Sequence, residues 1–370
     1  GPPPLLANDV QGNPRYAMGP SGGDVWGSIS IDPDPAEDRL FAPLGEQQAP
    51  PWVTATNGIL CLRASDGTKL WETQLASDST RPDIWDDGIR TRGADIATGN
   101  ITSISAPDVD GFQTVVVSTT PFVAESAFSG RELSIAGAAA ENTGSFAVAE
   151  YIANNTLKIL NPNGVAGGAV GTWKLNRIYD LDMGGTPHVV ITPGLNKYVV
   201  CGGKDGRIYV LDPATGAIVN QKQLIQMGLL GGFQTASAQL GNVVFFAGTD
   251  GAQIGREGSG TDVLNVSLDI TNVGPAVVVA VQISDAGVPS VLWKHAVSND
   301  ATPPLVIETG PHAGEVWTGR FGFGVFVANG VVFMQPAGST KLYAMDAATG
   351  ILLNALETNQ HTSGVGCISN

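Results

Sequence analysis

Apolar and polar residues alternate along most of this chain, in short stretches that end at turn-forming residues. A period of two predicts β-strands that bury one face, whereas an amphipathic helix needs a period of 3.6. No long stretch has the helical period, which disfavours βαβ units and a nucleotide-binding parallel sheet. The sequence therefore predicts an all-β fold.

One pattern recurs four times: a strand, a turn that contains Asp and Gly, and a second strand. The copies are NGILCLRASDGTKLWETQL from Asn57, DGRIYVLDPATGAIVNQKQL from Asp205, AVVVAVQISDAGVPSVLWKHAV from Ala276 and TKLYAMDAATGILLNALET from Thr340. Asp can accept hydrogen bonds from turn amides, and Gly can adopt a positive φ. Each copy predicts a β-hairpin.

A further strand pair precedes three of these hairpins, as in TPHVVITPGLNKYVVCGG and GVFVANGVVFMQPAG. Four antiparallel strands per repeat is the blade of a β-propeller. We expect residues 1–370 to form a single β-propeller domain with a loop insertion at about 252–275. The Ala-, Ser- and Asn-rich stretch at about 90–172 predicts either a long insertion or degenerate blades, and the sequence leaves both open.

Composition narrows the range of partners. Asp and Glu number 34 against 19 Lys and Arg, for a net charge of −15. Nucleic acid and anionic membrane surfaces both favour clustered basic residues, so neither is expected as the main partner. No apolar run has the roughly 18 residues that a membrane span needs. We expect no membrane span.

Cysteines and sequons bear on the compartment. Cys61, Cys201 and Cys367 lack metal-ligand spacing and are predicted to be small buried apolar residues. Asn-x-Ser/Thr sequons begin at Asn100, Asn154 and Asn265, and they would accept glycans in a secretory pathway. These sequons favour a secreted glycoprotein, extracellular or periplasmic.

The recurring hairpin resembles the repeat of PQQ-type (quinoprotein) propellers, which is close to A-x-D-x-x-T-G-x-x-x-W. DPATG at 212–216 and DAATG at 346–350 match its centre. The tryptophan, which in that family packs against the neighbouring blade, is present as Trp71 and Trp293. Asn220 and Asn354 replace it in the other two copies, where we expect this docking to be missing.

Longer segments are similar, in the same order, to PQQ-dependent alcohol and polyvinyl-alcohol dehydrogenases. They include VWGSISIDPDPAEDRLFAPLGEQQAPPW, RPDIWDD and YDLDMGGTPHVV followed by GGKDGRIYVLD. The resemblance implies an eight-bladed propeller of which this chain supplies the later part. Either the chain is part of a larger ring, which a second chain could complete, or the fold closes with fewer blades.

The resemblance also implies a site. Trp26 matches the ring beneath the flat quinone PQQ, and Asp86 matches the catalytic base, which also ligates Ca²⁺. Lys204 matches the cation that binds the quinone oxygens. Glu46 stands where the family has an Asn ligand of Ca²⁺, and it is itself an oxygen donor.

Each of these residues also has an ordinary structural interpretation. Trp26 could be a core aromatic residue, DIWDD a solvated turn and the Lys204 turn a plain hairpin. The first functional hypothesis is a PQQ- and Ca²⁺-dependent dehydrogenase that oxidises an alcohol or polyol. The second is a non-catalytic propeller that acts as an extracellular binding or assembly module. A propeller hydrolase or lyase acting on a polysaccharide ranks last, because no catalytic carboxylate pair can be placed.

Overall fold

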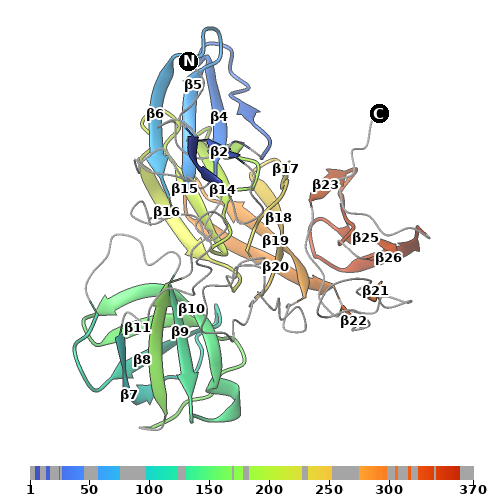
Figure 1. Cartoon of the computed structure of the whole chain (residues 1–370). Coiled ribbons are helices and arrows are strands. Elements are labelled where there is room, and N and C mark those ends of the chain that lie inside the picture. The colour runs from blue at the N-terminus through green and yellow to red at the C-terminus, as the bar shows by residue number, and fades with distance from the viewer. Residues whose placement is uncertain are drawn as a thin grey trace.

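The computed structural model describes residues 5–8, 14–16, 25, 27–45, 57–75, 97–122, 131–168, 171–177, 183–226, 232–251, 275–297, 305–306, 316–317, 324–336 and 339–358. Within these ranges the regular structure is β, apart from the short 3-10 helix η1 (Ala140–Asn142) (Figure 1). The all-β prediction is confirmed.

Four sheets in the described part of the chain each consist of four antiparallel strands joined in chain order. We call them the first to fourth blades. The first is β3 (Ser30–Ile31), β4 (Arg39–Leu44), β5 (Gly58–Arg63) and β6 (Lys69–Gln74). The second is β13 (His188–Ile191), β14 (Lys197–Gly202), β15 (Arg207–Leu211) and β16 (Ile218–Gln223).

The third blade is β17 (Ala238–Leu240), β18 (Val243–Thr249), β19 (Ala276–Ile283) and β20 (Pro289–Val297). The fourth is β23 (Val325–Ala328), β24 (Val331–Met334), β25 (Lys341–Asp346) and β26 (Leu352–Glu357). Two short pairs also form, β1 (Leu5–Asn8) with β2 (Pro14–Tyr16) and β21 (Leu305–Val306) with β22 (Val316–Trp317).

Each of the first three blades packs an apolar face on the next blade in the chain. Phe41 and Ile59 of the first blade share a buried cluster with Tyr209 and Leu211 of the second. Similar clusters join the second blade to the third and the third to the fourth. Face-to-face packing of successive four-stranded sheets is the architecture of a β-propeller, so the predicted fold class is confirmed.

The Asp-Gly turns have the predicted chemistry. Asp212 Oδ1 accepts hydrogen bonds from the amides of Ala214 and Thr215 at 2.9 and 2.8 Å, and Gly216 has a φ of 74°. Asp346 and Gly350 repeat this arrangement in the fourth blade. A carboxylate that satisfies two turn amides fixes the hairpin that the sequence predicts.

The motif tryptophans dock on the turn of the next blade. Trp71 Nε1 donates to the carbonyl oxygen of Pro213 at 3.1 Å, and a Cβ at Gly216 would lie 2.5 Å from the Trp71 ring. Trp293 repeats the contact on the turn that ends at Gly350. Glycine is therefore needed twice in this turn, for its positive φ and for the close approach of the indole.

A different side chain replaces the tryptophan between the second and third blades. Asn220 stands at the motif position there, and the ring of Tyr198 lies where a Cβ at Gly287 would meet it at 2.9 Å. The Tyr198 hydroxyl donates to the carbonyl oxygen of Asp285 at 2.8 Å. The tryptophan docking is missing, as expected, but the contact between the two blades is kept.

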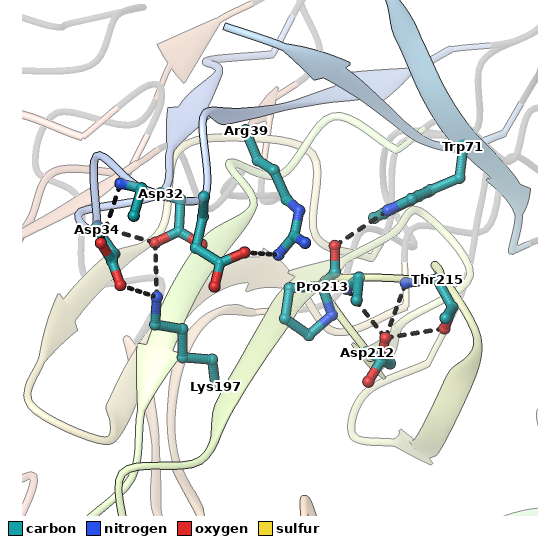
Figure 2. A network of polar contacts seen from close by, with 11 residues as sticks. Asp32, Asp34, Arg39, Trp71, Lys197, Asp212, Pro213 and Thr215 are labelled. Carbon is teal, nitrogen blue, oxygen red and sulfur yellow. Dashed lines mark hydrogen bonds and ion pairs between the residues drawn. The ribbon is translucent and has the colours of Figure 1, made fainter.

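An ion-pair cluster joins the first and second blades at the same end as the Trp71 contact. Lys197 Nζ lies 3.1 Å from Asp32 Oδ1 and 3.3 Å from Asp34 Oδ2, and Figure 2 shows this cluster beside the Trp71 contact. Partial burial opposes the charge of Lys197, but its pKa is raised because both carboxylates stabilise the ammonium. The two contacts hold neighbouring parts of one interface.

The stretch between the first and second blades contains a closed six-stranded barrel (Figure 1). Its strands are β7 (Ala97–Ile104), β8 (Phe112–Val117), β9 (Arg131–Ala136), β10 (Gly144–Ala153), β11 (Thr156–Leu160) and β12 (Thr172–Arg177). They close in the order β10-β11-β8-β7-β12-β9 around a buried apolar core of their own. The division of residues 1–370 into domains stays a prediction.

Two of the three cysteines are buried, as predicted. Cys61 and Cys201 are free thiols, and burial raises the pKa of Cys61 to about 11 and that of Cys201 further. Cys367 lies outside the described residues. No helix in the described ranges has the length and hydrophobicity to cross a bilayer.

Candidate functional site

Lys204 is the predicted site residue that falls within the described ranges. Trp26, Glu46 and Asp86 lie outside them. Lys204 occupies the turn between β14 and β15 and is buried, with 7% of its surface exposed. A lysine so far from water is unusual for a plain hairpin turn.

The turn that carries Lys204 continues into further buried charged groups. Asp205 is fully buried, accepts the amide of Arg207 at 3.1 Å and binds the Tyr209 hydroxyl. Burial raises the pKa of the Asp205 carboxyl, although the Arg207 charge and these hydrogen bonds oppose the rise. The turn is therefore a buried polar cluster at the edge of the second blade.

The segment that leads into the third blade covers one side of this turn. The Phe233 amide donates to the carbonyl oxygen of Gly203 at 2.9 Å. Gly232 has a φ of 73°, and a Cβ there would lie 2.1 Å from the carbonyl oxygen of Lys204. Only glycine allows the two backbones to approach so closely.

The segment 183–185 lies against the other side. A Cβ at Gly203 would lie 2.3 Å from the terminal carbon of Met183, and one at Gly27 would lie 2.8 Å from the carbonyl oxygen of Gly184. The Met183 amide donates to the carbonyl oxygen of Leu44 at 3.3 Å. Gly27 follows Trp26 in the chain, and Leu44 comes two residues before Glu46. Residues flanking three of the predicted site positions thus meet at one short segment.

The same turn attaches the barrel to the second blade. Arg207 is buried and donates from Nη2 to the carbonyl oxygens of Val148 and Ala149 on β10, at 2.6 and 2.9 Å. Gln226 adds two contacts, accepting the Ala147 amide at 2.7 Å and donating to the Leu160 carbonyl oxygen at 2.6 Å. No sequence motif predicts this role of Arg207, because it depends on the barrel.

A groove with a volume of about 450 Å³ lies where the first strands of three blades meet. Its lining is Ser30, Ile31, Pro33, His188, Val189, Ile191, Gln239 and Gly241. His188 Nε2 hydrogen-bonds Ser237 Oγ at 2.8 Å, and burial lowers the pKa of His188 to about 4. The imidazole is therefore neutral at physiological pH, and sequence analysis did not select it.

A metal ion needs several ligating side chains close together. No group of three or more His, Cys, Asp or Glu side chains suited to a metal ion occurs among them. The predicted Ca²⁺ ligands Glu46 and Asp86 both lie outside these ranges, so the metal site stays a prediction.

No protein-family model and no curated protein matches the chain. Among solved structures, BamB from Moraxella catarrhalis is 14% identical, with a TM-score of 0.31 over 96% of this chain and 75% of that one. The quinohemoprotein alcohol dehydrogenase ADHIIG from Pseudomonas putida HK5 is 11% identical, with a TM-score of 0.36 over 96% of this chain and 56% of that one.

A europium-containing methanol dehydrogenase is 11% identical, with a TM-score of 0.31 over 96% of this chain and 65% of that one. Similarity at TM-scores this low does not establish the family or the function of the chain. The β-propeller fold accordingly rests on the four blades and the contacts between them.

Proposed function

We propose that this chain is a PQQ-dependent dehydrogenase-like propeller that oxidises an alcohol or polyol. The observation that carries the proposal is the meeting, at segment 183–185, of residues that flank Trp26, Glu46 and Lys204. A site whose parts come from separate repeats needs such a meeting point. The proposal includes PQQ and Ca²⁺ as cofactors.

Two features of the described residues support this proposal. Lys204 supplies a cation in a place shielded from water, where its interactions are strong. Glycines at positions 27, 185 and 232 let backbone segments pack more closely than any side chain would allow, and Gly203 leaves room for the Met183 side chain. Trp26 would provide a stacking face, and Glu46 with Asp86 would hold the hard cation through carboxylate oxygens.

When bound, a quinone of this type accepts a hydride from the carbon of the alcohol. Asp86 would take the proton from the substrate hydroxyl, as a carboxylate held ionised by a neighbouring cation can do. Lys204 would donate a hydrogen bond to the quinone oxygens and stabilise negative charge there. Asp86 would thus remove the proton, and Lys204 would stabilise the negative charge.

Activity provides the test. The purified chain, supplied with PQQ and Ca²⁺, should oxidise members of a panel of alcohols and polyols with an artificial dye as electron acceptor. Asp86→Asn should bind the cofactor and lose turnover by a factor of about 10² or more, since the base is removed. Glu37→Gln, a carboxylate paired with Arg39 on the surface, is the matched control. Equal turnover in Asp86→Asn and in the unchanged chain would refute the assignment.

A non-catalytic binding or assembly module is the second candidate. The contacts of the Lys204 turn favour this candidate, because the turn is already held by the barrel, the third blade and segment 183–185 within the same chain. A folded chain that binds no PQQ would support this candidate.

In our proposal the protein acts outside the cytoplasm, whichever of the two functions it has. Asn100 and Asn154 are exposed, so both sequons are accessible to glycosylation.

A further inference from the structure

The three contacts between neighbouring blades use the same positions in each blade. Strand pairing aligns one residue from each of three neighbouring strands into a row that faces the next blade. The rows are Phe41, Cys61 and Trp71 in the first blade, Val200, Val210 and Asn220 in the second, and Phe245, Ala280 and Trp293 in the third. We call this the following row. In these three blades, the residues of the following row on the second and third strands are apolar and buried.

The fourth blade has the same row. Phe333, Ala344 and Asn354 are paired across β24, β25 and β26, and Phe326 extends the row on β23. The two phenylalanine rings stack with centroids 5.0 Å apart, yet both remain partly exposed. Leu356, beside the row, is 52% exposed. This row is built like the other three and has no covering blade among the described residues.

The first blade carries the opposite half of such a contact. Its face away from the second blade pairs Leu40 with Leu62 and Ala42 with Leu60. In the second blade the same positions hold Val199, Leu211, Cys201 and Tyr209, which are completely buried against the first blade. In the first blade the three leucines are only partly buried, and Ile31 at its edge is 62% exposed. We call this surface the preceding face.

The turn of the first blade is also uncovered. Gly67 has a φ of 74°, as Gly216 does, and its amide donates to the carbonyl oxygen of Arg63 as the Gly216 amide does to that of Asp212. A Cβ at Gly216 or Gly350 would lie 2.5 Å from a tryptophan ring, whereas a Cβ at Gly67 would meet no described residue within 4 Å. The docking turn is formed, and none of the described indoles lies on it.

We propose that two copies of this chain associate head to tail, the following row of each fourth blade packing on the preceding face of the other copy's first blade. The proposal is independent of the dehydrogenase function. One chain carries both halves of a contact that it makes three times internally, so a second copy offers the matching surface for each half. Figure 1 shows the first blade (blue) and the fourth (red) at separate ends of the series of blades.

A head-to-tail contact joins two different surfaces, and it closes when each surface is used once per copy. In a pair of copies each surface of one chain meets the matching surface of the other, so neither is left exposed. Burial of partly exposed leucine and phenylalanine side chains stabilises such a pair, since contiguous apolar surface of this kind marks an interaction site. The proposed particle is thus a ring of two chains.

The test is the mass of the particle in solution, measured by analytical ultracentrifugation at tens of micromolar protein. We expect two copies for the unchanged chain. Phe333→Asp in the fourth blade and Leu60→Asp in the first should each give single copies, because each places a charge in both contacts of the ring. Val109→Asp, at a fully exposed barrel position, is the control and should leave two copies.

Mixing the two variants identifies the geometry. Phe333→Asp and Leu60→Asp together retain one intact contact per pair, so an equimolar mixture should recover two-copy particles that neither variant forms alone. A contact between identical surfaces would not be restored by mixing. Single copies of the unchanged chain would overturn the proposal whether or not the variants fold, and so would two-copy particles in both Asp variants with native circular dichroism.

Discussion

At the residue scale, the glycines of the Asp-Gly turns have two separate functions that can be measured apart. Gly216 has a φ of 74° and lies under the Trp71 ring, whereas Gly330, in the Asn-Gly turn between β23 and β24, has a φ of 75° and no described residue within 4 Å of a Cβ placed there. An L-residue at either position carries the strain of the left-handed region. At Gly216 it also collides with an indole.

Gly216→Ala should therefore lower the free energy of unfolding by about 2–4 kcal/mol, of which about 1–2 kcal/mol is backbone strain and the rest is overpacking. Gly330→Ala, the matched control, should show the strain alone. Urea unfolding followed by tryptophan fluorescence measures both variants. Equal losses would mean that the tryptophan contact does not constrain the turn.

His188 predicts a pH dependence of stability. Its folded pKa of about 4 lies below the ordinary value of 6.5 because burial disfavours the charged form. Between these values the unfolded chain binds the proton more readily, so stability is complete above about pH 6.5 and falls as the pH drops towards 4. The full loss from this group, reached below about pH 4, is of the order of 3 kcal/mol.

Urea midpoints at pH 7.5 and 4.5 should therefore differ more in the unchanged chain than in His188→Gln, which cannot titrate. Gln keeps a hydrogen-bonding group near Ser237, which limits other effects of the change. An unaltered pH difference in His188→Gln would show that another group is responsible.

Residue patterns predicted the turns well and the contacts between blades in part. Asp, Thr and Gly in DPATG are adjacent in sequence, so their hydrogen bonds follow from local geometry. Tyr198 substitutes for the missing tryptophan from a different strand, and no motif spacing relates it to Asn220. Contacts supplied by another element are invisible to a local pattern.

At the element scale, the barrel is the feature that the sequence described least well. Its strands are short and rich in Ser, Thr and Asn, as in ITSIS and QTVVVSTT. Closure depends on the pairing of β7 with β12, which are far apart in the chain. Strand pairing over such distances is set by packing of the whole core, so alternation alone could not separate a barrel from degenerate blades.

Arg207 attaches this barrel, and its removal should release it. Arg207→Lys keeps the charge but loses the planar group that reaches both the Val148 and Ala149 carbonyl oxygens. We expect a stability loss of about 2–3 kcal/mol for the contact between barrel and blade. Hydrogen exchange should accelerate at β10 and at the adjoining β16, while the barrel's own β7 and β8 remain protected.

Arg63→Lys is the matched control, because Arg63 pairs with Asp66 on the surface. It should leave exchange in the barrel unchanged. Unchanged exchange at β10 in Arg207→Lys would show that Gln226 and the remaining contacts hold the barrel without the guanidinium.

At the scale of the whole molecule, the blades bring distant segments to one place. Segment 183–185 contacts residues beside positions 26, 46 and 204, which are separated by up to 178 residues in the chain. Lys204 could be selected in advance because its turn matched a known motif in order and spacing. The barrel contact of Arg207, three residues further on, could not, since it exists only in the folded chain.

Cofactor binding tests the central proposal most directly. Equilibrium dialysis with PQQ and Ca²⁺ should find one PQQ per chain, and Lys204→Met should weaken binding at least tenfold, corresponding to about 1.4 kcal/mol. Lys69→Met, at an exposed position of the first blade, should bind as the unchanged chain does. Circular dichroism would establish that each variant is folded. Absence of PQQ binding by the folded, unchanged chain would contradict the dehydrogenase account.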